Sequence, residues 1–149
     1  MSKSLQLSRR ASVFPSLILV VEEDADTRLM LKYLLEIWNY QVIEAKNDDE
    51  AFQMAIHYRP DLILMSINAG ETDRLTTSRR MREVPTLEQA VIIFVSAYSD
   101  EKTRASALAS GGNDYMIKPI DFGVLEKTLE NHLRVNAKTK EAAAVSKFL

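Results

Sequence analysis

The sequence of 149 residues has no cysteine, only two histidines, and only four glycines and four prolines. Without cysteine, the chain can form no disulfides, thiolate metal sites or cysteine nucleophile. So little glycine and proline excludes collagen-like and linker-like sequence. The two histidines, His57 and His132, are far apart in the sequence and cannot by themselves make a histidine-rich metal site. With 46% hydrophobic and 27% charged residues, the composition indicates one ordinary globular domain.

Long hydrophobic runs are also missing. The longest clean apolar run near the start is Leu17–Val21. It falls well short of the roughly 20 residues that a helix needs to cross a bilayer, and it is too short for the apolar core of a secretory signal. We therefore expect a cytoplasmic protein with no membrane partner.

Charge is distributed unevenly along the chain. Residues 1–16 carry three basic residues and no acid, whereas residues 17–135 carry 13 Lys+Arg against 20 Asp+Glu. Because an acidic body binds nucleic acid poorly, we do not expect a nucleic-acid partner. We predict a disordered basic tail at 1–16, a domain at 17–135, and a C-terminal tail or helix extension at 136–149.

Short apolar runs alternate with segments of helical periodicity through the predicted domain. Such alternation predicts an α/β fold, a doubly wound parallel sheet of five strands with helices on both faces. The expected strands are 17–21, 40–45, 61–65, 91–95 and 115–117. The expected helices are 25–38, 48–57, 73–83, 99–110 capped by Ser99, and a last helix capped by Asp121 and running to about Val135.

Polar residues follow four of these strands. Because the carboxyl ends of parallel strands meet at one edge of a sheet, we expect their side chains to converge there. Carboxylates, hydroxyls and one ammonium together suit a site for a cation and phosphoryl oxygens. In chain order, the residues are Glu22, Glu23, Ser66, Asn68, Ser96, Lys118 and Pro119.

These stretches resemble the receiver domain of two-component response regulators over residues 17–133. The matching segments are 17–24 (LILVVEED), 60–68 (PDLILMSIN), 95–98 (VSAY) and 111–119 (GGNDYMIKP). Each motif alone is weak, but their order and spacing together are specific. The resemblance implies the flavodoxin-like strand order 2-1-3-4-5, five helices, and a role in phosphorelay signalling rather than as an enzyme.

The resemblance also implies roles for the residues at the sheet edge. In this family an Asp ending the third strand accepts a phosphoryl group from a kinase phosphohistidine, and paired acids after the first strand hold Mg²⁺ with it. A hydroxyl and an aromatic residue switch position, and a Lys before a Pro neutralises charge. These roles fall on the acids Glu22 and Glu23, the switch residues Ser96 and Tyr115, and the Lys118-Pro119 pair.

The acceptor position holds Ser66, which departs from the family. An Asp is already anionic at neutral pH, since its reference pKa is about 3.9, whereas a serine hydroxyl needs a base. Neither His57 nor His132 is placed to supply one. Because Mg²⁺ demands near-octahedral oxygen geometry, the remaining Glu22 and Glu23 predict weak metal binding or none, and we expect no cofactor.

We therefore predict a pseudo-receiver that is not phosphorylated at Ser66 and acts by protein–protein interaction. Lys118 would pair with Glu22 or Glu23 without a metal. One alternative is a phosphorylation-competent receiver that uses Mg²⁺ and another acceptor, for which Asp73 is a candidate. A second alternative is a metal-dependent phosphatase-like enzyme.

The first expected helix is apolar around most of its circumference. Leu29, Tyr33 and Ile37 form one stripe at helical spacing, and a helix on one face of a sheet needs only a single apolar face. In receivers this helix is part of the surface met by kinases, so we predict a histidine kinase, a phosphotransfer protein or a downstream effector as partner. A homodimer, or a terminal tail packed over the stripe, are the other interpretations.

The third expected helix is rich in arginine. We expect its arginines to form a solvated face rather than a binding patch. After Val135 only 14 residues remain, too few for a DNA-binding unit, which predicts a stand-alone domain. The arginines concerned are Arg74, Arg79, Arg80 and Arg82.

Overall fold

The computed structural model describes residues 15–70 and 73–146, with side chains to residue 134. Within them, five parallel strands form one sheet in the order β2-β1-β3-β4-β5, which confirms the predicted fold. The strands are β1 (Leu17–Val21), β2 (Gln41–Ala45), β3 (Leu62–Ile67), β4 (Val91–Ser96) and β5 (Asp114–Ile117). The helices are α2 (Ala25–Ile37), α3 (Asp48–Tyr58), α4 (Asp73–Arg82), α5 (Glu101–Ala109), α6 (Phe122–Ser146) and the short 3₁₀ helix η1 (Pro85–Leu87).

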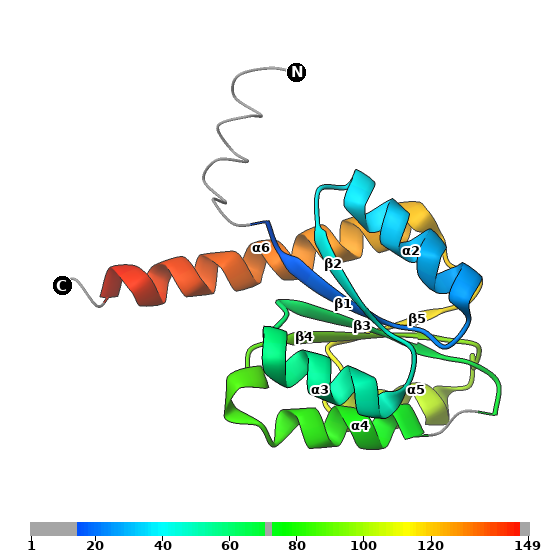
Figure 1. Cartoon of the computed structure of the whole chain (residues 1–149). Coiled ribbons are helices and arrows are strands. Elements are labelled where there is room, and N and C mark those ends of the chain that lie inside the picture. The colour runs from blue at the N-terminus through cyan, green and yellow to red at the C-terminus, as the bar shows by residue number, and fades with distance from the viewer. Residues whose placement is uncertain (1–14, 71–72, 147–149) are drawn as a thin grey trace.

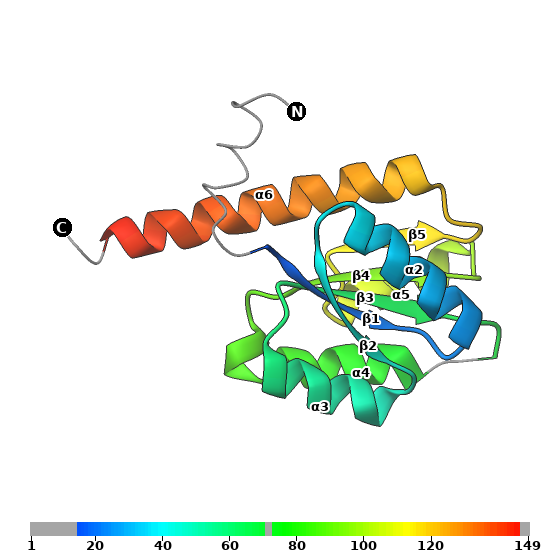
Figure 2. The same ribbon diagram turned by 45° about the horizontal axis from the view of Figure 1, so that its top comes forward.

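Helices cover both faces of the sheet. Helices α2 and α6 lie on one face, and α3, α4 and α5 lie on the other (Figures 1 and 2). The central strands β3 and β4 are buried along their whole length, as expected for parallel strands covered on both sides. Two apolar clusters result, one on each face of the sheet. The α2–α6 cluster includes Leu31, Leu35, Leu125 and Leu129, and the opposite one includes Ala51, Ala55, Met81 and Ala107.

Aspartate and asparagine side chains fix where the first two helices begin. Asp24 is the N-cap of α2 and its carboxylate accepts the Thr27 N–H at 2.9 Å. Asn47 caps α3 and its side chain accepts the Glu50 N–H at 2.8 Å. Both caps stand just beyond a strand, so each helix starts at the carboxyl edge of the sheet.

Several predicted boundaries differ from the observed ones. Strand β3 continues to Ile67, so Ser66 lies inside the strand rather than after it. Helix α5 is capped by Asp100, which accepts the Thr103 N–H at 2.9 Å, and not by Ser99; both residue types cap well, so sequence could not separate them. Helix α6 continues past the predicted end near Val135 to Ser146, which agrees with the predicted alternative of a helix extension. Of the predicted tail at 1–16, residues 1–14 lie outside the described residues.

The prediction that the α4 arginines form a solvated face is wrong for two of them. Arg74 is only 2% exposed. The Arg82 guanidinium donates hydrogen bonds of 2.7–3.0 Å to the carbonyl oxygens of Gly111, Leu87 and Ala90. These bonds connect α4 to η1 and to the loop before β5. Gly111 has φ +113°, a conformation that favours glycine, and a Cβ there would lie 2.5 Å from Arg82 Cγ.

The long helix α6 is not a membrane span. In the part of the chain that the structure describes, no helix combines the length and the apolar character that crossing a bilayer requires.

Candidate functional site

The carboxyl ends of the central strands bring the predicted polar residues together. Ser66 and Ser96 lie near the ends of neighbouring strands, where Ser66 pairs in register with Val95 and Ile67 with Ser96. Glu22 directly follows β1, and Lys118 directly follows β5. Because all five strands are parallel, these four residues meet at one edge of the sheet.

A compact hydrogen-bonded network connects Glu22, Ser66, Asn68 and Lys118. The Ser66 hydroxyl donates to Glu22 Oε1 at 2.7 Å, and Lys118 Nζ donates to Ser66 Oγ at 2.7 Å. Lys118 Nζ also lies 3.4 Å from Glu22 Oε1 and donates to Asn68 Oδ1. Asn68 Nδ2 donates to Glu22 Oε2 at 3.0 Å. Each of the four side chains therefore has partners within the set.

Glu22 is the buried anion of this network, with 1% of its surface exposed. Burial raises its pKa, but hydrogen bonds from Asn68, Ser66 and the Asp24 N–H, together with Lys118, outweigh burial and hold the pKa below its ordinary value. The Glu22–Lys118 pair sums to zero charge. Of the two glutamates named as partners of Lys118, the structure pairs Glu22 with it.

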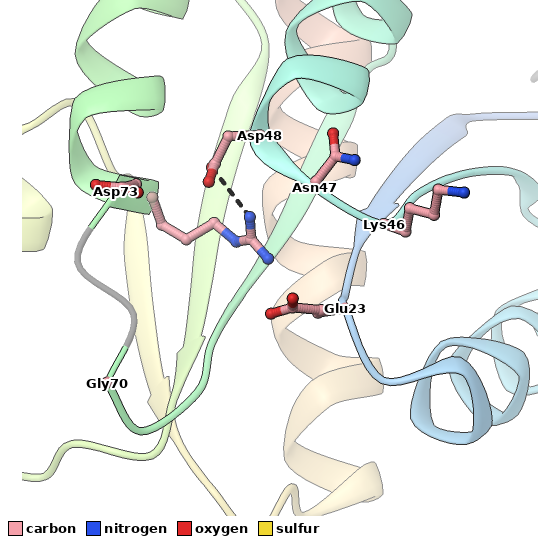
Figure 3. Close-up of a pocket in the computed structure, with 7 residues that line it drawn as sticks. Glu23, Lys46, Asn47, Asp48, Gly70 and Asp73 are labelled. Carbon is pink, nitrogen blue, oxygen red and sulfur yellow. Dashed lines mark ion pairs between the residues drawn. The ribbon is translucent and has the colours of Figure 1, made fainter.

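Glu23 lies apart from the network that Glu22 forms with Ser66, Asn68 and Lys118. It is exposed and lines an open pocket of about 280 Å³ beside the network (Figure 3). Successive residues leaving a strand point to opposite sides, so two adjacent acids do not naturally share one target. The pocket is lined by Glu23, Lys46, Asn47, Asp48, Gly70, Asp73 and Arg74.

The residues present do not fit a resident Mg²⁺. Both oxygens of Glu22 accept hydrogen bonds, Ser66 offers a neutral hydroxyl whose proton faces Glu22, and Glu23 lies apart. Among the side chains that the structure describes, in residues 15–70 and 73–134, no three His, Asp or Glu gather as metal ligands would. Magnesium needs several anionic or carbonyl oxygens in tight octahedral geometry.

The predicted switch residues form a second chain of contacts. Ser96 is fully buried and its Oγ accepts the Tyr98 N–H at 3.0 Å. The Tyr115 hydroxyl donates to the Tyr98 carbonyl oxygen at 2.6 Å, and the Tyr98 hydroxyl accepts the Gly70 N–H at 2.7 Å. Lys118 joins this chain to the network, because its main-chain N–H donates to the Ser96 carbonyl at 2.8 Å. The Lys118–Pro119 peptide is cis.

Arg74 is a site residue that the sequence analysis missed. Its Nε donates to the Ser66 carbonyl oxygen at 2.9 Å, and its Nη1 lies 3.0 Å from Asp48 Oδ1. The dashed line in Figure 3 marks this ion pair with Asp48. Arg74 belongs to the face of α4 that packs on the domain, whose buried residues recur at helical spacing. They are Arg74, Thr77, Ser78 and Met81.

The apolar stripe predicted on the first helix is exposed. Leu29 is 45% exposed, Tyr33 58% and Ile37 73%, while Leu31 and Leu35 on the other side of α2 are buried. The stripe begins beside the network, since the Arg28 guanidinium on the same helix donates to the Glu22 carbonyl at 2.8 Å.

Comparison with known proteins identifies the family to which this fold belongs. The family model for the response regulator receiver domain matches residues 18–130. The chain therefore belongs to the response regulator receiver family of two-component signalling.

Individual relatives share this region. Transcriptional regulatory protein ZraR of Escherichia coli is 35% identical over 117 residues, 78% of this chain but 26% of ZraR, so the chain spans about a quarter of that protein. An uncharacterized 14.6 kDa protein of Leptolyngbya boryana is 38% identical over 104 residues, covering 70% of this chain and 79% of the relative.

Solved structures show the same likeness. A two-component response regulator from Clostridium difficile has a TM-score of 0.73 and 28% identity, with 80% of this chain and 96% of the other covered. A response regulator from Thermotoga maritima has a TM-score of 0.71 and 28% identity, with 81% and 99% covered.

Proposed function

We propose that this receiver domain is a pseudo-receiver, which takes no phosphoryl group at residue 66 and signals through contacts with other proteins. The observation that carries the proposal is the position of the Ser66 hydroxyl between Glu22 and Lys118. It donates to the first at 2.7 Å and accepts from the second at 2.7 Å. The oxygen that would attack phosphorus thus already donates one hydrogen bond and accepts another.

The chemistry of the acceptor supports the same conclusion. Glu22 is the only acid bonded to the Ser66 hydroxyl within the described residues, and it is the candidate base for a phosphorylation-competent alternative. Its pKa is held below the ordinary value by Asn68, Ser66 and the Asp24 N–H against the effect of burial, so it is a weak base. A weak base activates a serine hydroxyl poorly.

The other candidate acceptor is poorly placed. Asp73 is exposed in the first turn of α4 and lines the neighbouring pocket rather than the network. Lys118, which would neutralise an incoming phosphoryl group, is bonded to Ser66, Asn68 and Glu22 instead.

A receiver that does not use phosphate must act through its surface. We infer that the exposed stripe of Leu29, Tyr33 and Ile37 on α2 contacts a signalling partner: a histidine kinase, a phosphotransfer protein or an effector. Contiguous exposed apolar side chains mark contact sites more often than chance, which supports this assignment. Changing Leu29 and Tyr33 to serine should abolish partner binding without unfolding the domain.

The experiment is intact-mass spectrometry after incubation with Mg²⁺ and a small phosphodonor such as acetyl phosphate. The unaltered chain, Ser66→Asp and Ser66→Ala are treated side by side. We expect no phosphoryl adduct on the unaltered chain or on Ser66→Ala. An adduct on Ser66→Asp alone would show that one residue silenced the pocket, and an adduct on no variant would show that the whole pocket has lost its chemistry. An adduct on the unaltered chain that Ser66→Ala removes would overturn the proposal.

A further inference from the structure

The network around Glu22 places a lysine amine directly against an amide carbonyl. Lys118 Nζ lies 2.5 Å from Asn68 Oδ1. The amide carbon, Asn68 Cγ, is one C=O bond of about 1.23 Å beyond that oxygen, so it lies within about 3.7 Å of Nζ. Reacting atoms in well-oriented intramolecular reactions stand about 3–3.5 Å apart. The two groups are therefore close to the distance at which an amine nitrogen adds to a carbonyl carbon.

The orientation of the Asn68 amide is set by its two charged neighbours. Its Nδ2 donates to Glu22 Oε2 at 3.0 Å, and its Oδ1 accepts from Lys118. An ammonium group has no acceptor and a carboxylate has no donor, so the reversed amide would lose both hydrogen bonds. The carbonyl therefore faces the amine, and the amide nitrogen, which would be the leaving group, faces the carboxylate.

A path for protons joins Lys118 to Glu22. Lys118 Nζ donates to Ser66 Oγ at 2.7 Å, and the Ser66 hydroxyl donates to Glu22 Oε1 at 2.7 Å. The direct distance from Nζ to Oε1 is 3.4 Å. An amine attacks a carbonyl only after it has lost its extra proton, and this path can remove it. The same carboxylate thus contacts both the amine and the leaving nitrogen.

Glu22 is a better base for an amine than for an alcohol. It is a weak base toward the Ser66 hydroxyl, but an ammonium group gives up a proton far more readily than a hydroxyl does. Glu22 is 1% exposed. Because burial disfavours charged forms, it favours a proton transfer that leaves both the acid and the amine neutral.

We propose that Lys118 and Asn68 form an isopeptide bond within the folded domain, with Glu22 as the proton carrier. The Nζ–Cγ bond forms when the neutral amine adds to the amide carbon, and the Cγ–Nδ2 bond breaks. Nδ2 takes one proton directly from Nζ and one from Glu22, and leaves as ammonium. Glu22 ends as the carboxylate it was, and no oxidant, reductant or water is consumed.

The bond would join the carboxyl ends of two strands, because Asn68 directly follows β3 and Lys118 directly follows β5. These residues are 50 positions apart in the chain. Lys118 would lose its charge and could no longer neutralise a phosphoryl group. The inference rests on the geometry of the network and is independent of the proposed function.

The test is the intact mass of the unaltered full chain, measured on purification and during several days in neutral buffer without a phosphodonor. We expect a species lighter than the calculated mass by one ammonia molecule. Tandem mass spectrometry of a tryptic digest should then find a branched peptide that joins Lys118 to Asn68. A folded chain that keeps its full mass throughout would overturn the proposal.

Lys118→Arg separates the isopeptide bond from cyclisation of an asparagine onto its own backbone, which also expels ammonia. Arginine keeps the positive charge but is not deprotonated in proteins, so it supplies no nucleophile. We expect no loss of mass in this variant. Lys46→Arg is the matched control at the neighbouring pocket and should behave as the unaltered chain. A loss of ammonia that persists in Lys118→Arg would overturn the proposal.

Glu22→Gln tests the proton carrier. It should slow the formation of the linked species by about a hundredfold or more, the usual contribution of a general base. Glu23→Gln changes the adjacent, exposed acid in the same way and should leave the rate unchanged. Equal rates in these two variants, with both folded by circular dichroism, would overturn the role of Glu22. Because no phosphodonor is present, failure here leaves the phosphodonor experiment on Ser66 to decide the proposed function.

Discussion

Arg74 Nε donates a hydrogen bond of 2.9 Å to the carbonyl oxygen of Ser66, so the first turn of α4 is tied directly to the residue at the acceptor position. The same guanidinium meets Asp48 on α3, and Asp48 also accepts a hydrogen bond from Thr77. Two helices and the central strand are therefore joined through one buried cation. Because of this hydrogen bond, a displacement of α4 should also displace residue 66.

Replacing Arg74 with alanine should destabilise the domain by about 3 kcal/mol, because the Ser66 carbonyl loses a buried donor and the half-buried Asp48 loses its cation. Urea denaturation followed by circular dichroism measures the loss. Arg79→Ala, at an exposed position on the same helix, is the control and should change stability by less than about 0.5 kcal/mol. Equal effects of the two changes would show that the Arg74 contacts contribute little.

The Glu22–Lys118 pair should be strongly coupled. Lys118→Met leaves the buried Glu22 carboxylate without its cation and should cost about 2–4 kcal/mol of the free energy of unfolding. Glu22→Gln should rescue much of that loss in the double variant, giving a coupling energy of about 1–3 kcal/mol. Strict additivity of the two single changes would contradict the pairing.

Stability should fall as the solution is acidified through the titration of Glu22. Its pKa is lower in the folded state, so between the two pKa values the unfolded chain binds more protons. The Glu22 contribution is therefore complete above the ordinary glutamate pKa of about 4.3 and is lost as pH falls through the folded value. Denaturant titrations between pH 7 and the acid limit should show a shallower loss for Glu22→Gln.

Some acid sensitivity should remain in that variant. Asp24 and Asp100 cap helices, and hydrogen bonds from Thr27 and Thr103 lower the pKa of each carboxyl. Their contributions run in the same direction as that of Glu22. An unchanged acid profile after Glu22→Gln would mean that the network does not hold the charge on Glu22.

Arg82→Lys should destabilise the domain by about 2–3 kcal/mol, although the charge is kept, because lysine cannot reproduce the planar fork of donors. The carbonyl oxygens of Gly111, Leu87 and Ala90 would lose partners. Thermal or urea unfolding measures the change. Arg80→Lys is the comparison, since Arg80 is exposed and stacks 4.2 Å over the Phe52 ring, and it should cost under about 1 kcal/mol. Similar losses in both variants would contradict this account.

The sheet was predictable because its central strands β1, β3 and β4 are buried along nearly their whole length. A short continuous apolar run such as Leu17–Val21 is typical of a buried strand in a parallel sheet, and its predicted bounds match β1. The convergence of Glu22, Ser66 and Lys118 followed from the parallel topology alone. The end of α6 was left open between a tail and a helix extension, because the sequence after Val135 has no glycine or proline that would mark a helix end before Ser146.

Details of the site depended on packing that no local pattern encodes. Glu22 and Glu23 are identical in type and adjacent, and the side chains that hold Glu22 come from far along the chain: Ser66, Asn68 and Lys118. Arg74 was assigned to solvent because arginine is seldom buried without a partner. Its partners, Asp48 and the Ser66 carbonyl, come from α3 and β3 and are invisible in the sequence around Arg74.

The course of α2 has a consequence for how the domain handles information. The helix starts at Asp24, whose N–H is bonded to Glu22, and ends at Trp38, close to where residue 16 meets residue 41. One end of α2 thus contacts the Glu22 network, and the other lies near the Ser16–Gln41 hydrogen bond at the opposite edge of the sheet. A protein bound along this helix would therefore respond to changes at both edges of the sheet.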